Sequence, residues 1–391
     1  MIPYGKQHIT VDDLTSVMNI LNSDFLTQGP AVKQFEEAIC KTCDVSFSTA
    51  FSNATAALHI ACRALGVGKG DRVWTSPNSF VASANCALYC GASVDFVDIC
   101  PRTLNMSVDL LQTKLEEAAA QNALPKVVIP VHFAGHSCDM QRIKRLSEQY
   151  KFYIIEDASH AIGAEYLNGP VGDCRYSDIC VFSFHPVKII TTGEGGVATT
   201  NSQALYDSLQ LLRTHGVTRD TKAMTNESHG SWYYQQVELG YNYRLTDLQC
   251  ALGVSQLKRL REYIEKRNEL ALIYNTQLAD LPIILPAKEN YARSAYHLYV
   301  IQIDNDKTKV TRKNVFEYLR AQNIGVNVHY IPIHTQPYYK TLGFSQGDFP
   351  NAEIYYSRAI SIPLFSQMTT SEQNHIIKTL RNYSKNENIL F

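Results

Sequence analysis

The chain has 391 residues, of which 45% are hydrophobic and 19% charged, and its formal net charge is −1. This balance argues against binding of nucleic acid or of a membrane surface through bulk charge, and no apolar run approaches the roughly 20 residues that span a bilayer. Because the N-terminus lacks the basic and apolar regions of a signal peptide, we expect a cytoplasmic enzyme, long enough for two domains.

The first part of the chain predicts three helices separated by turns. Thr10 and Asp13 have the form of a capping box, which predicts that a helix begins there. Its apolar residues share one face: Leu14, Val17, Met18 and Leu21. Pro30 is well placed to open a second helix. The small residues after Phe51, at 52–55, lead into a third helix, where free backbone N–H groups suit a phosphate. In isolation, an ordinary helix cap is the favoured interpretation of this segment.

Short runs rich in β-branched and aromatic residues recur between helical patterns and predict buried strands. They are Arg72–Thr75, Val94–Val97, Val127–Val131, Phe152–Ile155, Ile179–Phe184 and Val197–Thr200. Strands that alternate with helices predict the α/β class, with a mainly parallel central sheet flanked by helices. Residues 219–231 are polar and weakly patterned, which predicts a mobile surface loop.

The pattern changes in the last third of the chain. Thr246 and Gln249 form a capping box at the start of a long helical pattern, which we expect to bridge two domains. The elements predicted after it are a strand over Tyr296–Ile303, a helix over Lys313–Ala321 and a strand over Ile324–Tyr330. We therefore divide the chain into residues 1–245, a large domain with its N-terminal segment, and residues 246–391, a linker helix with a small α+β domain.

The ten cysteines suggest neither disulfides nor a metal site. Cys40 and Cys43 form the one CxxC pair, and no second pair follows at the spacing of a zinc site. Most of the others lie in apolar surroundings, where free cysteine behaves as a small hydrophobic residue. His132 and His136 lie near Cys138, but a loop with incidental ligand types is the better interpretation. We expect ten reduced thiols and no metal.

The strongest chemical signal lies between residues 152 and 200. Asp157 follows the predicted strand Phe152–Ile155, Ser183 lies near the end of the predicted strand Ile179–Phe184, and Lys188 comes shortly afterwards. Because ligands bind outside the carboxyl ends of strands in open α/β sheets, we expect these three side chains to share one crevice. Taken singly, a loop lysine is usually solvated and an aspartate after a strand usually caps a turn. Together they suggest a Schiff-base lysine and a carboxylate that keeps a pyridine nitrogen protonated.

Three other positions are candidates for ligand contact. Phe80 lies in a strand-to-helix loop, where it could stack on a flat ligand or serve as a core aromatic residue. The segment from His329 to His334 ends a predicted strand near the domain boundary, which favours substrate contact, although a lone histidine is more often structural. Arg244 could hold a carboxylate or phosphate bidentately, or form a surface ion pair.

With these motifs in order, the sequence resembles the DegT-type sugar-nucleotide aminotransferases. The strongest matches are EDASH at 156–160, FSFHPVK at 182–188 and GYNYR at 240–244, and the resemblance covers nearly the whole chain. It implies the fold-type I architecture of pyridoxal-phosphate enzymes, a mainly parallel central sheet flanked by helices with a smaller C-terminal α+β domain.

The resemblance also implies roles for individual residues. Lys188 would be the catalytic residue and would hold pyridoxal 5′-phosphate, which becomes pyridoxamine phosphate during turnover. Asp157 would pair with the pyridine nitrogen, Phe80 would stack on the ring and His160 would lie near the ring hydroxyl. The phosphate would be held by Ala54, Thr55 and Ser183 of one subunit and by Asn242 of the other. The residues implied near the sugar nucleotide or the amino donor are Tyr4, Thr27, Arg244, His329 and Tyr330.

The activity implied is that of a homodimer with shared active sites, which moves an amino group from L-glutamate to a nucleotide-linked keto sugar. The stretches SFHPVK, TTGEGG and NVHYIPIH look most like the branch of the family that serves pseudaminic acid biosynthesis. That branch implies C4 of a UDP-linked 4-keto-6-deoxy-N-acetylhexosamine as the acceptor. The alternative is another nucleotide-linked keto sugar, such as a dTDP-4-keto-6-deoxyhexose or a 3-keto sugar. Related dehydratases carry histidine where Lys188 stands, and no GxxxxGK[ST] motif supports an NTPase.

Overall fold

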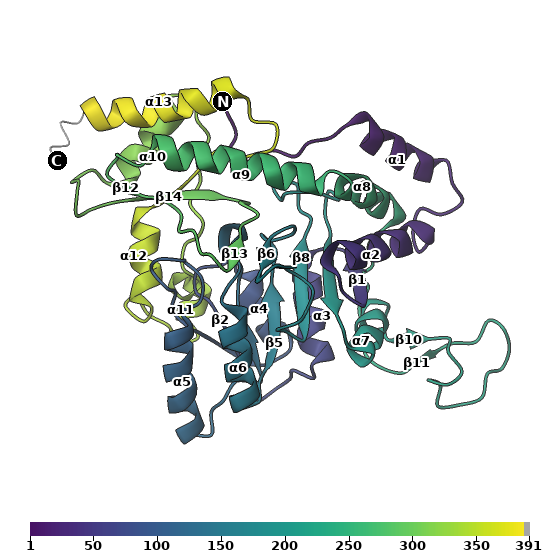
Figure 1. The fold of residues 1–391 in the computed structure, drawn as a ribbon. Helices are drawn as coiled ribbons and strands as arrows, with labels where there is room; N and C mark the ends of the chain where they lie inside the picture. The colour runs from purple at the N-terminus through teal and green to yellow at the C-terminus, as the bar shows by residue number, and fades with distance from the viewer. Residues whose placement is uncertain (387–391) are drawn as a thin grey trace.

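A seven-stranded sheet forms the centre of the computed structural model, which describes residues 1–386 (Figure 1). The order of its strands is β1-β9-β8-β5-β4-β2-β3. Their bounds are β1 Phe47–Phe51, β2 Arg72–Thr75, β3 Ser93–Phe96, β4 Val127–Ile129, β5 Tyr153–Asp157, β8 Ile179–Ser183 and β9 Gly196–Thr200. Strands β3, β2, β4, β5 and β8 run parallel. The predicted α/β class with a mainly parallel sheet is confirmed.

Strand β9 is one of the exceptions in the mainly parallel sheet, because it runs antiparallel to both β8 and β1. Residues 184–195 connect β8 to β9 without a helix. A parallel crossover usually contains a helix that returns the chain to the other end of the sheet, whereas this connection lets the chain reverse. Strand β1, which the sequence patterns did not predict, covers the outer edge of β9.

Helices cover both faces of the sheet. On one face lie α3 (Ala54–Ala64), α4 (Ala82–Tyr89) and α7 (Gln203–Arg213), which share a core with Ile155 of β5. On the other face lie α5 (Val108–Ala120) and α6 (Met140–Tyr150), which share a core with Ile154. The two neighbouring isoleucines enter opposite cores because side chains alternate along a strand. Both faces of the sheet therefore carry apolar side chains, and helices cover both.

Helix α1 (Val11–Leu21) begins at the predicted capping box, but its apolar face is not buried. Leu14, Met18 and Leu21 are 63%, 54% and 60% exposed. The helix instead meets α8 (Asp247–Leu257) through Asp13, which accepts hydrogen bonds from Gln256 and Arg259. The predicted helix is present, and periodicity identifies its apolar face but not what covers that face.

The predicted long helix after Thr246 is two helices. The capping box of Thr246 and Gln249 opens α8, and α9 (Leu260–Gln277) follows after a break at 258–259. Arg259 leaves the helical path and bonds both Asp13 of α1 and the hydroxyl of Tyr263. Helix α2 (Pro30–Cys43) begins with Pro30 as predicted and packs against α8.

The C-terminal part contains a second, three-stranded sheet of β12 (Ile283–Ile284), β14 (Tyr299–Ile303) and β15 (Ala359–Ile362). The helices around it are α10 (Arg312–Ala321), α11 (Pro337–Lys340), α12 (Pro350–Arg358) and α13 (Thr370–Asn386). The predicted strand over Ile324–Tyr330 is wrong. Ile324 and Asn327 make only isolated bridges, to Ile2 and Ser361, and Gly325 lies so close to Ile2 that a Cβ would collide with its carbonyl oxygen.

The two halves of the chain share elements. Strand β13 (Ala292–Arg293) pairs with β6 (Glu165–Tyr166), which pairs in turn with β7 (Gly169–Pro170). The boundary at residue 245 stays a prediction, but segments from beyond it pack within the first half. Within residues 1–386, no helix is both long and apolar enough to cross a membrane.

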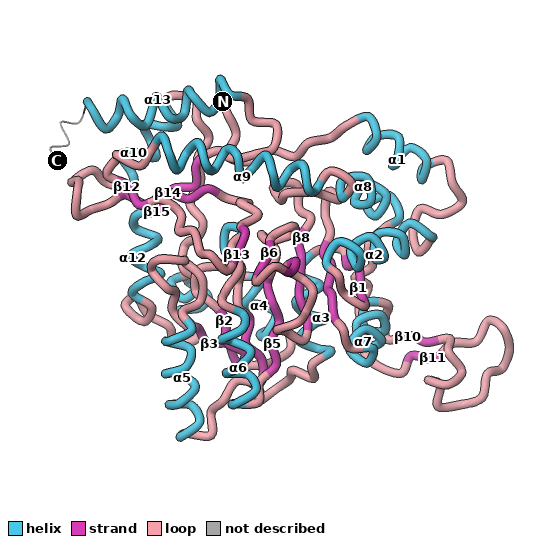
Figure 2. Tube along the Cα trace, in the orientation of Figure 1, coloured by secondary structure: helices cyan, strands magenta, loops and turns pink. Residues whose placement is uncertain are grey.

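An arm extends from the body beside α7 (Figures 1 and 2). It begins and ends with the short paired strands β10 (Val217–Thr218) and β11 (Gln235–Gln236). The loop between them is the one predicted over residues 219–231. Trp232 on this arm is 72% exposed and Leu239 just after it is 71% exposed. Like the face of α1, the arm presents apolar side chains that this chain does not cover.

Candidate active site

Asp157 and Ser183 end neighbouring parallel strands, β5 and β8, so they lie at the same edge of the central sheet. Lys188 follows in a turn, where its N–H donates to the carbonyl of His185 at 2.8 Å. Lys188 is partly buried. Burial lowers the pKa of its amine to about 8, and the negative charge of Asp157 opposes that shift. Within residues 1–386, no acceptor is hydrogen-bonded to its amine.

The Asp157 carboxylate is 5% exposed and held on both oxygens. Ser83 Oγ donates to Oδ2 at 2.6 Å, and the N–H of Ser159 donates to Oδ1 at 3.1 Å. Sequence reasoning missed Ser83, which lies in the first turn of α4 among small apolar residues. A serine among small apolar residues is a signal that could have found it, because a buried hydroxyl needs a hydrogen-bond acceptor.

His160 has a fixed tautomer. The N–H of Ala134 donates to its Nδ1 at 3.2 Å, so the ring proton is on Nε2, which lies 3.0 Å from the hydroxyl of Tyr330. Burial, and then the charge of Lys188, hold the pKa of His160 well below its usual value. His297, also missed from the sequence, packs on His160 with ring centroids 4.4 Å apart. The neutral imidazole therefore donates to Tyr330.

The residues from the C-terminal half approach the same place. His329 Nδ1 lies 2.8 Å from Ser361 Oγ, and the ring of Tyr4 lies 5.4 Å from that of His329. Burial, helped by the charge of Lys188, lowers the pKa of His329 to about 4. We call Lys188, Asp157, His160, His329 and Tyr330 the lysine cluster.

Phe80 is exposed at the edge of the lysine cluster. Its side chain is 59% exposed, and its ring centroid lies 6.4 Å from that of Tyr330. The alternative that Phe80 is a core aromatic residue is therefore wrong. An exposed ring beside buried polar groups presents a flat apolar face to whatever enters the site.

The three predicted phosphate residues come together at the start of α3. Ala54 and Thr55 are the first two residues of that helix, where backbone N–H groups have no intrahelical acceptor. Ser183 pairs with Gly196 at the start of β9. A Cβ at Gly196 would lie 2.5 Å from the backbone nitrogen of Ala54, so only glycine lets the strand approach the helix this closely. The arrangement is a cradle for an anion.

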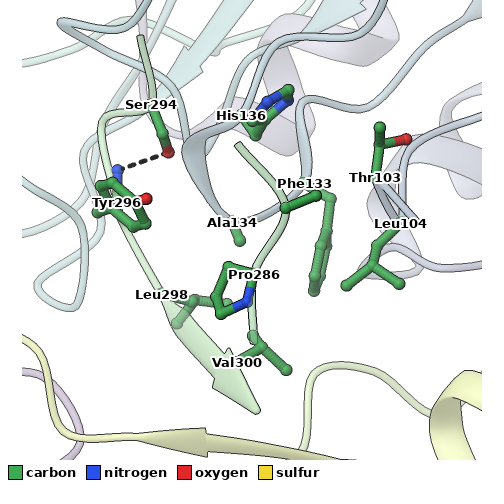
Figure 3. Close-up of a pocket in the computed structure, with 11 residues that line it drawn as sticks. Thr103, Leu104, Phe133, Ala134, His136, Pro286, Ser294, Tyr296, Leu298 and Val300 are labelled. Atoms are coloured by element: carbon green, nitrogen blue, oxygen red, sulfur yellow. Dashed lines mark hydrogen bonds between the residues drawn. The ribbon is translucent and has the colours of Figure 1, made fainter. Parts of the chain in front are cut away.

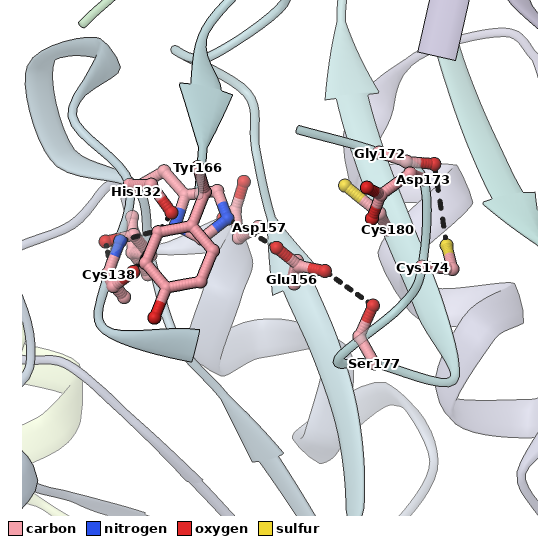
Figure 4. Close-up of polar contacts among 12 residues, drawn as sticks. His132, Cys138, Glu156, Asp157, Tyr166, Gly172, Asp173, Cys174, Ser177 and Cys180 are labelled. Carbon is pink, nitrogen blue, oxygen red and sulfur yellow. Dashed lines mark hydrogen bonds and ion pairs between the residues drawn. The ribbon is translucent and has the colours of Figure 1, made fainter. Parts of the chain in front are cut away.

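A buried polar network lies beside Asp157 (Figure 4). Ser177 Oγ donates to one oxygen of Glu156 at 2.5 Å, and His132 Nε2 lies 2.7 Å from the other. The N–H of Cys138 donates to His132 Nδ1 at 3.1 Å, so this histidine is fully used by protein partners. Asp139 caps α6 through the N–H of Arg142. Each of these side chains therefore already has protein partners in the network.

Figure 3 shows a pocket next to Ala134, the residue whose N–H donates to His160. Its walls are mostly apolar and include Phe133, Leu298 and Val300. Of the described residues that line it, none is a predicted site residue.

Three predicted residues lie apart, and we call Thr27, Asn242 and Arg244 the outer group. Thr27 bridges to Thr246, and Asn242 bridges to Thr214. Tyr241 and Tyr243 pack on His59, with ring centroids 4.8 and 6.0 Å away. Because side chains alternate in an extended segment, Asn242 and Arg244 face away from that aromatic contact.

The surroundings of Arg244 are polar and partly open. It lines a surface pocket with Gln28, Arg213 and Glu36. In the part of the chain that the structure describes, no contact joins the outer group to Lys188. The outer group is therefore apart from Lys188, although its segment reaches the chain beside the phosphate cradle, where the N–H of Ser52 donates to the carbonyl of Tyr243 at 2.8 Å.

A family model described as the DegT/DnrJ/EryC1/StrS aminotransferase family matches residues 7–381. The chain belongs to this family. The resemblance predicted from the motifs is thus confirmed, and the protein is a sugar aminotransferase that depends on pyridoxal phosphate.

Two relatives of this family member match over nearly their whole length. The spore coat polysaccharide biosynthesis protein SpsC of Bacillus subtilis is 39% identical over 389 residues, covering 98% of this chain and 97% of SpsC. A UDP-4-amino-4,6-dideoxy-N-acetyl-β-L-altrosamine transaminase of Campylobacter jejuni is 37% identical over 381 residues, covering 97% of this chain and 96% of that enzyme.

Solved structures of the DegT family agree with the fold. PseC of Helicobacter pylori, an aminotransferase involved in the biosynthesis of pseudoaminic acid, has a TM-score of 0.90 at 30% identity, covering 98% of this chain and 99% of PseC. Spr1654 of Streptococcus pneumoniae, in its PMP form, also has a TM-score of 0.90 at 30% identity and covers 100% of both chains. The predicted fold-type I architecture is confirmed.

The residues of this DegT-family chain fit the cofactor of the family. The cradle at α3 offers N–H donors and a helix N-terminus to a phosphate, and Gly196 keeps it clear of side-chain atoms. Lys188 has a lowered pKa and no acceptor among the described residues, which suits an amine that attacks an aldehyde. Asp157 is an oriented carboxylate close enough to influence that amine.

Proposed function

We propose that the protein transfers an amino group from L-glutamate to C4 of a UDP-linked 4-keto-6-deoxy-N-acetylhexosamine, in pseudaminic acid-type nonulosonate biosynthesis. The observation that carries the chemistry is Lys188, a partly buried lysine with a pKa lowered to about 8 beside the oriented carboxylate of Asp157. The similarity to the Campylobacter jejuni transaminase and to PseC supports this acceptor.

The roles proposed for the cofactor-binding residues come from the family resemblance, and the geometry of their groups supports them. When bound, pyridoxal phosphate supplies an electron sink for the electron pair left when a proton is removed from the carbon that carries the amino group. Asp157 would favour a protonated ring nitrogen through opposite-charge attraction. Phe80 would offer its exposed face to the ring, and His160 would lie near the ring hydroxyl. Ala54, Thr55 and Ser183 would hold the phosphate.

Lys188 has two roles in this proposal. Its neutral amine would hold the cofactor, and once freed from it, Lys188 Nζ would be the general base. It would take the proton from the amino-bearing carbon of the donor and return a proton on the acceptor side. Tyr4, His329 and Tyr330 would contact the sugar nucleotide or the donor. The low pKa of His329 keeps it uncharged, so one of its ring nitrogens donates a hydrogen bond and the other accepts one.

The outer group completes the site from a second subunit. Asn242 would contact the phosphate, and Thr27 and Arg244 the sugar nucleotide or the donor carboxylate. The supporting observation is that these residues lie apart from the lysine cluster and face away from the aromatic contact with His59. A homodimer with shared active sites brings both groups together. The exposed apolar face of α1 and the arm supply surface for such contact.

A second acceptor class has its own support. SpsC, at 39% identity, is a spore coat polysaccharide biosynthesis protein. Its identity to this chain is similar to that of the Campylobacter jejuni transaminase, so sequence identity supports another nucleotide-linked keto sugar equally well. A dTDP-4-keto-6-deoxyhexose and a 3-keto sugar belong to this class. The chemistry at Lys188 is the same for both acceptors, so only the product distinguishes them.

The test is product analysis by NMR after incubation with L-glutamate and a panel of UDP- and dTDP-linked 4-keto and 3-keto sugars. We expect amination at C4 of the UDP-linked N-acetyl sugar, and loss of all turnover in Lys188→Ala. Lys378→Ala, at an exposed lysine of α13, is the matched control and keeps full activity. Preferred amination of a dTDP-linked or 3-keto sugar would contradict the proposed acceptor, and turnover by Lys188→Ala would contradict the mechanism.

A further inference from the structure

Two buried hydroxyl groups form a chain that ends on the Asp157 carboxylate. Ser79 Oγ lies 2.7 Å from Ser83 Oγ, and Ser83 Oγ lies 2.6 Å from Asp157 Oδ2. The two serines are 4% and 1% exposed. Neither has a role in the proposed function so far, and buried hydroxyl groups that bond to a site residue instead of to backbone need an explanation.

The direction of the hydrogen bonds can be worked out from the acceptors. Ser83 Oγ has three acceptors in reach: Asp157 Oδ2 at 2.6 Å, Ser79 Oγ at 2.7 Å and the carbonyl of Phe80 at 3.4 Å. The shorter contact to a charged acceptor is the stronger one, so Ser83 gives its single proton to Asp157. Ser83 can then only accept from Ser79. The chain therefore runs from Ser79 through Ser83 to the carboxylate.

Ser83 also helps to fix the orientation of the Asp157 carboxylate. Ser83 binds Oδ2 and the N–H of Ser159 binds Oδ1, so a rotation of the Asp157 side chain would break both bonds. Of these two donors, the Ser159 N–H belongs to the backbone just after β5. Ser83 is the donor that a side-chain substitution can remove, and it comes from a different element, α4.

The segment from Ser79 to Ser83 also carries Phe80. The N–H of Ser83 donates to the carbonyl of Phe80 at 3.3 Å, which closes a turn at the start of α4. In the proposed function, Phe80 faces the plane of the cofactor ring and Asp157 faces its nitrogen. One five-residue segment thus joins the two residues that would contact the ring from different directions.

We propose that Ser83, supported by Ser79, is a positioning residue that keeps the Asp157 carboxylate directed at the cofactor's ring nitrogen. The inference rests on the proposed function, because it needs Asp157 opposite that nitrogen. Ser83 acts through Asp157 and touches no reacting atom. It therefore affects how fully the ring nitrogen is protonated and how tightly the cofactor is held.

The test compares Ser83→Ala with Ser83→Thr, which restores a hydroxyl. The main readout is the protonation of the ring nitrogen, followed by NMR across pH in enzyme loaded with isotope-labelled cofactor. Loss of the Ser83 donor leaves the Asp157 carboxylate free to turn, so Asp157 becomes a weaker partner and the ring nitrogen loses its proton at lower pH. We expect a downward shift of about one pH unit and about tenfold weaker cofactor retention by dialysis.

Two further variants serve as controls. Ser79→Ala, which removes only the supporting donor, is expected to shift the titration in the same direction by less. Ser147→Ala is the matched control, since Ser147 is also buried in a helix but donates to the carbonyl of Phe152, away from the site. We expect Ser147→Ala to leave the ring titration unchanged and Ser83→Thr to restore it.

Asp157→Asn separates the inference from the function on which it rests. A shift in Asp157→Asn with none in Ser83→Ala overturns the role of Ser83 and leaves the proposed function standing. No shift in Asp157→Asn overturns both. An equal shift in Ser147→Ala also overturns the inference, because the effect would then be one of general packing. A shift in Ser83→Ala that Ser83→Thr reverses, with Ser147→Ala unchanged, supports it.

Discussion

The lysine cluster and the outer group differ in how much of their environment the chain itself supplies. In the lysine cluster, Asp157 is bonded on both oxygens and His160 on both nitrogens. In the outer group, Thr27 and Asn242 are held by isolated backbone bridges, and Arg244 lines an open pocket. The polar groups of the lysine cluster are hydrogen-bonded within one chain and are held in place before the cofactor binds. For the outer group, we infer that a second subunit provides further contacts.

The most direct test of whether the lysine cluster and the outer group act from different subunits is to mix two inactive variants. We expect Lys188→Ala to be inactive and Arg244→Gln to be severely impaired, because it removes a bidentate partner for an anion. If the two residues act in one site from different subunits, a mixed dimer has one intact site. Random exchange then restores about a quarter of the wild-type activity, measured as turnover after exchange is demonstrated by mass spectrometry.

The control for this experiment uses two residues of the lysine cluster. Lys188→Ala mixed with Asp157→Asn leaves a defect in both sites of every mixed dimer, so turnover should not rise above that of the parents. Recovery in this control, or none in the first mixture despite exchange, would show that the two groups are not divided between subunits as we propose.

A smaller effect is expected at the contact between the two halves of the lysine cluster. Tyr330→Phe removes the hydroxyl that accepts from His160 Nε2 and leaves a buried donor unpaired, which costs about 1–3 kcal/mol. We expect kcat/KM to fall about tenfold. Tyr338→Phe, at a 60% exposed tyrosine nearby, should leave kcat/KM unchanged. Equal activity in the two variants would mean that the hydrogen bond between His160 and Tyr330 has no part in turnover.

The smallest expected effect is a change in pH dependence. Below about pH 8, Lys188 carries a proton and cannot attack an aldehyde, so capture of pyridoxal phosphate by the apoprotein should rise with pH and level off above about pH 8. The charge of Asp157 raises this pKa, so Asp157→Asn should move the midpoint to lower pH. Capture is followed by the visible absorbance of the lysine-bound cofactor. A midpoint near 10.5, the ordinary value for lysine, would contradict the burial argument.

Much of the lysine cluster could be predicted from the sequence because its residues follow strands. Asp157 and Ser183 end two apolar runs, and parallel strands bring their carboxyl ends to one edge. Ser83 and His297 could not be predicted in this way. Their roles depend on which buried atoms lie within hydrogen-bonding or packing distance, and periodicity carries no such information.

One wrong prediction and two features that were not predicted have a common physical cause. The absence of a strand over Ile324–Tyr330, the exposure of the apolar face of α1 and the direction of β9 all depend on what lies next to a segment in space. Local patterns describe the segment itself. They identified the helix at Val11–Leu21 and the strand at Gly196–Thr200. They did not identify what lies against the apolar face of the helix or which strands pair with the strand.

The sheet formed by β13, β6 and β7 has a consequence for building chimaeras of family members. A crossover at residue 245 would take Ala292 and Arg293 from one parent and their pairing partners Tyr166 and Glu165 from the other. Arg293 also forms an ion pair with Glu165 across that junction. Exchange of acceptor specificity between relatives would therefore need matched replacement of residues 165–170 and 292–293, so that the sheet is inherited as a unit.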